Sequence, residues 1–188
     1  MGLDMYLKMV PKVSSVEELR ELEIRLSDAY FTGKDKFEKE LKKIQKEKKF
    51  KNPIQYIESE WVPNKESYEK WKALGEHSPK IELRQEVGYW RKFNALHAWF
   101  VETFQGGVDE CQSSLVDPEV LRGLFDQLLI INKKNAKAIM PTQGGFFFGG
   151  TDYDQYYWQD IEALKKFLLH LFDGNDFKET TLMYRASW

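Results

Sequence analysis

GLDMYLKMV, residues 2–10, alternates apolar and polar side chains with a period of two residues. One face carries the apolar members and the other face the polar ones: Leu3, Met5, Leu7 and Met9 against Asp4, Tyr6 and Lys8. This period is typical of a strand with one buried face. The sequence therefore predicts a half-buried strand at the start of the chain, with Asp4 and Tyr6 on its second face.

The last segment, TTLMYRASW at residues 180–188, is rich in residues that favour strands. We expect it to pair beside the N-terminal strand. Such pairing would bring Tyr184 and Arg185 near Asp4 and Tyr6. Both ends of the chain are thus predicted to belong to one small sheet.

Helical patterns fill much of the intervening chain. Ser15 and Glu18 form a capping box, Asp117-Pro118-Glu119 is a second helix start, and Thr151 or Asp152 can cap a third. Their predicted inward positions are Val16, Leu19, Leu22, Leu26 and Tyr30; Val120, Leu121, Leu124, Leu128 and Ile131; and Tyr157, Ile161, Leu164, Leu168 and Leu171. A narrow stripe of Phe37, Leu41 and Ile44 predicts a further helix on the outside of the fold.

The strongest central pattern is GYWRKFNALHAWFVETF, residues 88–104. Aromatic and histidine side chains recur in it at spacings of 3, 4, 3 and 4: Trp90, Phe93, His97, Phe100 and Phe104. This spacing predicts a helix over the whole stretch, largely surrounded by protein. The preceding run IELRQEV, residues 81–87, fits either a short extended segment or the lead into that helix.

These elements predict an α+β fold with four to five helices packed on a small, mainly antiparallel sheet that contains both chain termini. A chain of 188 residues is most simply one domain over residues 1–188. Residues 50–80 contain Pro53, Pro63 and Pro79 and are interpreted as a proline-punctuated insertion or arm.

Charge and cysteine content set limits on the partners and the compartment. The formal charge of −2 and pI near 6.0 give no global attraction to nucleic acid or an anionic membrane, so nucleic acid binding is not expected. Cys111 is the only cysteine, and no apolar run of membrane-spanning length is present, which favours a cytoplasmic protein. Residues 34–51 hold nine lysines against four acidic residues, a solvated helix face or a patch for an acidic partner.

The stretch GGFFFGGTDYDQYYW, residues 144–158, combines seven aromatic side chains with two glycine pairs. Three interpretations remain open: a short buried strand over Phe146–Phe148 with core packing of Tyr157 and Trp158, a wall of a ligand site, or a protein interface. No phosphate-loop pattern is present, and Asp152 and Asp154 would repel an anion at the following helix start. Two acceptors there suit hydroxyls, amines or the donor edge of a base.

The candidate ligand-binding residues are polar or aromatic side chains from the central stretch, the glycine-rich stretch and the two terminal strands. They are Asp4, Tyr6, Trp90, Arg91, Asn94, His97, Phe148, Asp152, Tyr153, Tyr156 and Arg185. Asn94, His97 and Arg91 would orient the ligand while rings stack on it. The alternative is that Asn94 and His97 are satisfied core groups. No metal-ligand spacing is found, so neither a metal nor a cofactor is predicted.

The segments MGLDMYL, EVGYWRKFNALHAWF, PTQGGFFFGGTDYDQYYW and YRASW resemble a group of small proteins carried by bacteriophages and prophages. They cover about a quarter of the chain. The resemblance implies a phage or bacterial cytoplasmic setting, with no activity or catalytic residue attached. By analogy with small phage proteins that counter host defence, sequestration of a nucleotide signal is one expectation.

Three functional hypotheses follow. The first is a non-catalytic protein that binds a small, planar, polar and perhaps nucleotide-like ligand. The second is an interaction factor that binds a host protein through its aromatic or lysine-rich surface, and homo-oligomers are also open. The third is a hydrolase that uses His97 as base and Asp4 or Asp152 as its orienting carboxylate.

Overall fold

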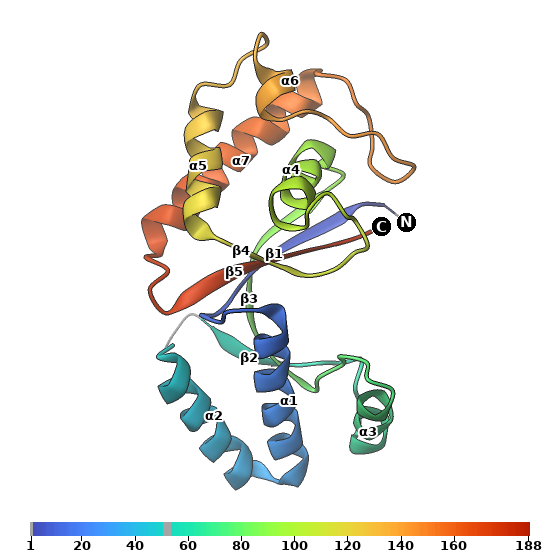
Figure 1. The fold of residues 1–188 in the computed structure, drawn as a ribbon, viewed down its shortest axis with the longest axis vertical. Helices are drawn as coiled ribbons and strands as arrows, with labels where there is room; N and C mark the ends of the chain where they lie inside the picture. The colour runs from blue at the N-terminus through green and yellow to red at the C-terminus, as the bar shows by residue number, and fades with distance from the viewer. Residues whose placement is uncertain (1, 51–53) are drawn as a thin grey trace. The chain divides into compact units, whose positions relative to one another are not determined.

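The computed structural model describes residues 2–50 and 54–188. They form an α+β fold with seven helices and a five-stranded antiparallel sheet (Figure 1). The helices are α1 (Val16–Thr32), α2 (Lys34–Lys48), α3 (Lys65–Ala73), α4 (Asn94–Phe104), α5 (Pro118–Leu129), α6 (Ala136–Ile139) and α7 (Gln155–Gly174). The predicted fold class is confirmed, with more helices than the four to five expected.

The strands are β1 (Asp4–Pro11), β2 (Gln55–Glu58), β3 (Ile81–Arg91), β4 (Ser114–Val116) and β5 (Thr180–Ser187), in the order β2-β3-β1-β5-β4. The predicted pairing of the two terminal strands is confirmed, because β5 is the neighbour of β1. Figure 1 shows the two chain ends close together beside these strands. The period-two pattern also holds in β1 and the residue before it, where the apolar members are buried: Leu3, Met5, Leu7 and Met9.

The chain divides into two compact units. Unit 1 contains the chain up to Lys8, Glu86–Phe177 and Leu182–Trp188, and unit 2 contains Met9–Gln85 and Lys178–Thr181. Strands β1, β3 and β5 contribute residues to both. The single domain over residues 1–188 and the insertion over residues 50–80 stay predictions, and residues 51–53 of that insertion lie outside the described residues.

In unit 1, α5 and α7 pack against each other, and their inward faces follow the predicted spacing. Leu121, Leu124 and Leu128 of α5 are buried. Val120, predicted on the same face, is exposed. It lies one position, and so a large rotation about the helix axis, from Leu121. On α7 all five predicted inward residues are buried: Tyr157, Ile161, Leu164, Leu168 and Leu171.

In unit 2, α1 packs against α2. The predicted cap of α1 is present, since Ser15 Oγ accepts from the Glu18 amide at 3.1 Å. From the buried face of α1, Glu23 accepts from the Leu83 amide at 2.9 Å and Ser27 accepts from the Ile81 amide at 3.0 Å. Side chains of α1 thus satisfy backbone donors at the start of β3.

The helix predicted over residues 88–104 is wrong in its first part. Strand β3 continues to Arg91, and α4 begins only at Asn94. Between them Lys92 adopts a positive φ of 59°, which neither a strand nor a helix continues. The helical spacing of Trp90 and Phe93 was coincidental, because aromatic residues also favour strands and Trp90 lies in β3.

The glycine-rich stretch does not form the strand that one of its three interpretations predicted over Phe146–Phe148. Residues 146–148 form a turn, where Phe146 is 95% exposed and Phe148 is buried. A buried strand is therefore wrong here. Helix α7 is capped by Asp154, whose Oδ1 accepts from the Tyr156 and Tyr157 amides at 2.9 and 3.1 Å. The cap predicted at Thr151 or Asp152 is thus displaced, since residue type alone does not choose between neighbouring aspartates.

Candidate ligand cavity beside the glycine-rich loop

A cavity of about 480 Å³ lies within unit 1. The end of β3, the start of α4, the loop of residues 141–154 and the first turns of α7 all contribute to it. Its lining consists of Arg91, Lys92, Phe93, Asn94, Ala95, Thr142, Gly149, Gly150, Asp152, Asp154, Tyr156, Tyr157 and Asp160. Its volume falls within the roughly 300–1,000 Å³ of small-molecule sites.

Asn94 fixes the loop that forms one wall of the cavity. Its amide nitrogen donates to the carbonyl oxygens of Phe148 at 3.1 Å and Gly150 at 2.7 Å. Its Oδ1 accepts from the Gln143 amide at 3.1 Å. These three bonds join both arms of the loop to the start of α4, so Asn94 acts on the cavity by shaping its wall.

Further bonds close the same loop. Thr142 Oγ1 donates to the Thr151 carbonyl at 2.8 Å, and the Thr142 amide donates to the Tyr153 hydroxyl at 3.2 Å. The Leu3 amide donates to the Phe147 carbonyl at 3.1 Å, which ties the loop tip to the residue before β1. The loop therefore has a defined path over the cavity.

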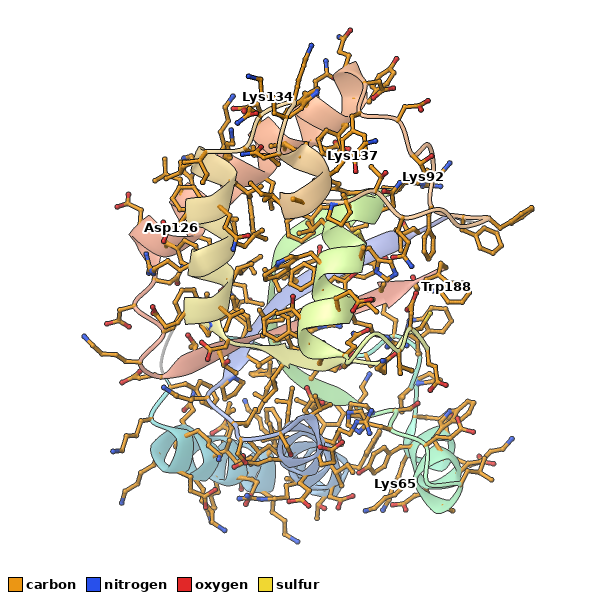
Figure 2. All side chains as sticks on the ribbon, turned by 45° about the horizontal axis from the view of Figure 1, so that its top comes forward. Lys65, Lys92, Asp126, Lys134, Lys137 and Trp188 are labelled. Atoms are coloured by element: carbon orange, nitrogen blue, oxygen red, sulfur yellow. The ribbon has the colours of Figure 1, made fainter. Side chains whose placement is uncertain are left out.

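Gly149 explains why the stretch needs glycine at this point. Its φ is +90°, and an added Cβ would lie 3.5 Å from Lys92 Cβ. An L side chain here would be strained in its backbone. Figure 2 shows Lys92 beside the loop. The glycines thus let the loop approach the β3–α4 junction, where a helix containing Trp90 was expected.

Charge in the cavity comes from two separate parts of the chain. Arg91 and Lys92 bring two cations from the end of β3, and Asp152, Asp154 and Asp160 bring carboxylates from the loop and α7. Within the part of the chain that the structure describes, neither cation forms an ion pair. The cavity therefore offers both donors for an anionic group and acceptors for an amine.

The pKa of Asp160 is raised above its ordinary value, first by partial burial and then by the charge of Asp154. A donor or cation between the two carboxylates would relieve their repulsion. Asp154 keeps one oxygen on the α7 amides. Asp160 is the carboxylate with more freedom to accept from a ligand.

Three tyrosines lie near the cavity, and they differ in availability. Tyr157 is buried and donates to the Met140 carbonyl at 2.9 Å, while Tyr153 packs on it at 4.8 Å between ring centroids. Tyr156 lines the cavity and is 73% exposed. Tyr156 is therefore the ring that can stack on a ligand.

His97 lies outside the cavity lining and is fully buried. Its Nδ1 is 2.7 Å from the Tyr184 hydroxyl and its Nε2 is 2.8 Å from Asp109 Oδ2. Burial raises the pKa of the Tyr184 hydroxyl, and both ring nitrogens of His97 are occupied by these two hydrogen bonds. The carboxylate beside His97 is Asp109, and the prediction of Asp4 or Asp152 in that place is wrong.

The other predicted residues lie in separate contacts. Trp90 packs on Phe167 with ring centroids 5.0 Å apart, and Phe148 packs on His97 at 5.0 Å. Arg185 Nε donates to the Cys111 carbonyl at 3.3 Å.

On the open face of the strands, Tyr89 donates to Asp4 at 2.5 Å, and its ring lies 5.4 Å from Tyr6. These contacts all lie outside the cavity lining. Of the predicted set, the structure brings together Arg91, Asn94, Asp152 and Tyr156 at the cavity.

Sequence reasoning missed Lys92, Thr142 and Asp160 as lining residues. A usable signal existed for Asp160, because it follows Tyr156 by four residues and so shares its helix face. Lys92 carried no signal, since its place follows from the left-handed turn between β3 and α4.

Neither a metal-binding cluster nor a membrane-spanning helix is found in the part of the chain that the structure describes. Among residues 2–50 and 54–188, no three side chains of the types that bind metals are grouped to hold an ion. No helix in those ranges has both the length and the apolarity to cross a membrane.

Comparison of the chain with protein-family models, with curated proteins and with solved structures found no significant match.

Proposed function

We propose that this protein binds a small polar ligand that carries a donor edge at one part and an anionic group at another. A nucleotide-like molecule fits this description. The observation that carries the proposal is the pairing, within one cavity, of two cations from the β3–α4 junction with carboxylates from the loop and α7. Here Arg91 and Lys92 would hold the anionic group, and Asp160 and Asp152 would accept from the amine edge.

A planar ligand also gains from the ring at the cavity. Tyr156 presents an exposed face that can stack on a base. The loop fixed by Asn94 adds backbone groups of Gly149 and Gly150 to the wall. A site preformed in this way loses less conformational entropy when it binds its ligand.

Binding without catalysis is favoured by the placement of His97. The hydrolase alternative depends on this residue as base, yet both of its ring nitrogens are hydrogen-bonded in a fully buried position. A general base must reach the proton that it abstracts. Thr142, a hydroxyl at the cavity, already donates to the Thr151 carbonyl.

The phage-like segments support a bacterial host as the setting of this binding. In that setting, a phage factor that sequesters a nucleotide signal would weaken host defence without chemistry of its own. The support is the resemblance of the motifs together with the mixed charge of the cavity.

The experiment is a thermal-shift series with defined probes: nucleoside monophosphates, cyclic dinucleotides, adenosine alone and inorganic phosphate alone. A probe present at 100 times its Kd stabilises the protein by about 2.7 kcal/mol. For a chain of this length that corresponds to a rise in Tm of about 5–10 °C. No shift with any probe at millimolar concentration would overturn the proposal.

Matched variants locate the binding. Lys92→Gln and Asp160→Asn are expected to abolish the shift, whereas Lys134→Gln and Asp126→Asn make the same charge changes on the exposed surface. Figure 2 shows Lys134 and Asp126 on that surface, away from Lys92. Equal loss in both pairs would mean that the probes respond to net charge and not to the cavity.

One further observation favours the protein-interaction alternative. Phe146, at the turn of the glycine-rich loop, is 95% exposed. Exposed aromatic side chains are enriched where partners bind. A host protein that is captured by the wild type and lost with Phe146→Ala, with no probe shifting Tm, would replace the ligand proposal by this one.

A further inference from the structure

The outer face of α2 carries a row of lysines that is independent of the cavity. Lys36, Lys39, Lys42, Lys43 and Lys46 are all exposed. At 3.6 residues per turn they fall on one arc, which lies opposite the apolar stripe. Phe37 and Ile44 of that stripe are buried, so the lysine arc faces solvent.

Asp35 is exposed and falls on this arc at the first turn of α2, whereas the other acidic residues of the helix pair with cations outside the row. Arg25 of α1 donates to Glu40 at 2.6 Å and to Glu47 at 3.2 Å. Lys34, outside the arc, lies 3.9 Å from Glu38. The guanidinium of α1 thus occupies two carboxylates that would otherwise lie beside the lysines.

Of the five lysines in the row, Lys43 alone has a carboxylate within ion-pair distance among the described residues, and Glu47 lies 4.0 Å from it. Such an exposed pair contributes little. Residues 34–49 hold eight lysines against four acidic residues. The row is therefore a local positive surface on a chain of net charge −2.

The composition of the row selects a class of partner. None of the exposed large apolar side chains belongs to α2. Protein interfaces rely on buried aromatic or apolar anchors and contain few lysines at their centre. Membrane-surface helices need an apolar face that enters the lipid, and here that face is buried in unit 2.

A nucleic acid backbone needs only charge. Duplex DNA carries one negative charge per about 1.7 Å of its axis. The row from Lys36 to Lys46 runs about 15 Å along the helix axis. Lysine binds phosphate as a point charge without reading bases, and no exposed ring stands among the lysines to stack on an unpaired base.

We infer that the outer face of α2 binds the phosphate backbone of double-stranded nucleic acid without selecting its base sequence. The sequence-based expectation against nucleic acid used the charge of the whole chain. Charges farther away than about 8 Å are largely screened at physiological salt. The lysines of α2 therefore dominate the field that a duplex meets at this face.

The test is fluorescence anisotropy with a labelled duplex of about 20 base pairs, titrated at several salt concentrations. The wild type is expected to bind with a Kd in the range of about 10⁻⁶ to 10⁻⁴ M that rises steeply with salt. The triple variant Lys39→Gln, Lys42→Gln, Lys46→Gln is expected to bind at least tenfold more weakly. Its log–log salt slope is expected to fall by about 2 to 3, the value for three lost phosphate contacts.

The matched control is Lys133→Gln, Lys134→Gln, Lys166→Gln, which removes the same charge from exposed positions of unit 1. It is expected to keep both the affinity and the salt slope. Two duplexes of unrelated sequence are expected to bind equally.

Several outcomes would overturn the inference. They are no duplex binding at low salt, equal loss with the control triple, tighter binding to single strands than to the duplex, and binding only to vesicles that contain anionic lipid. Because the cavity probes bind unit 1 and are read by Tm, failure of this inference leaves that result untouched.

Discussion

At the residue scale, Asn94 shows how a polar side chain that suits a ligand can serve the wall of a site instead. The amide type and its place at the start of a helix were visible in the sequence. Its partners, at Gln143, Phe148 and Gly150, lie about fifty residues away along the chain. The spacing of residues within one segment does not predict hydrogen bonds to a segment so far away in the sequence.

Asn94→Ala is expected to destabilise the protein by about 2–4 kcal/mol, because it removes three hydrogen bonds to the loop, one of them to the carbonyl of the buried Phe148. Urea unfolding measures this loss. The same variant is expected to weaken probe binding at the cavity, since the loop loses its fixed path. A stable variant with unchanged unfolding would contradict the role of Asn94 as the loop clamp.

The hydrogen bond between His97 and Tyr184 can be tested in the same way. Tyr184→Phe removes only the hydroxyl that is hydrogen-bonded to Nδ1 and keeps the ring, which stacks on Phe100 at 4.0 Å. The expected loss in unfolding free energy is about 1 kcal/mol. An unchanged stability would show that the Tyr184 hydroxyl is not what satisfies His97.

At the element scale, the sequence predicted most of the regular structure. The alternation of β1, the Ser15 cap of α1 and the Asp117-Pro118 start of α5 are short-range signals, and all three are confirmed. The reciprocal half of the predicted capping box differs, because Glu18 accepts from Ser14. The prediction of the boundary between β3 and α4 was wrong because Trp90 and Phe93 are spaced as they would be in a helix. The turn at Lys92 depends on tertiary packing, which a local pattern does not contain.

The cap of α7 by Asp154 can be tested by mutation. Asp154→Ala is expected to cost about 1–2 kcal/mol, because it removes an acceptor from two helix amides. Asp152→Ala, the matched change at the neighbouring aspartate, is expected to cost much less. Equal costs in thermal unfolding would argue that α7 does not begin at Asp154.

The contact between the start of α1 and the end of α2 gives a pH dependence. Lys48 donates to Glu18, and with bonds from Ser14 this lowers the pKa of Glu18 from 4.5 to about 2. A carboxyl whose folded pKa is lowered stabilises the fold above its unfolded pKa, and that stabilisation is lost as pH falls through the folded pKa. Stability is therefore expected to decline between pH 4.5 and about 2.

Glu18→Gln is the control for this dependence. It is expected to flatten the decline in that window and to lower stability at neutral pH, as read by urea unfolding across pH. A decline of the same size in the variant would assign the acid sensitivity to other carboxyls.

At the scale of the whole molecule, charge is distributed by structure in a way that composition hides. The net charge of the chain is −2, yet α2 carries an arc of lysines and the cavity contains two cations beside carboxylates. The lysine arc stays positive because Arg25 pairs with Glu40 and Glu47. In the cavity, one oxygen of Asp154 is occupied because it accepts from an α7 amide. The sequence named residues from both stretches that line the cavity, 91–95 and 142–160, but it could not show that they meet, because the stretches lie about fifty residues apart.

The central claim is that the cavity of unit 1 binds a nucleotide-like ligand. Its most direct test is an NMR titration of the ¹⁵N-labelled protein with the best probe of the thermal-shift series. If the cavity binds the probe, saturable shifts are expected at the amides of Lys92, Thr142, Gly149, Gly150 and the first turn of α7, and Lys92→Gln is expected to weaken the binding. Saturable shifts that avoid these amides, or none at millimolar probe, would contradict it.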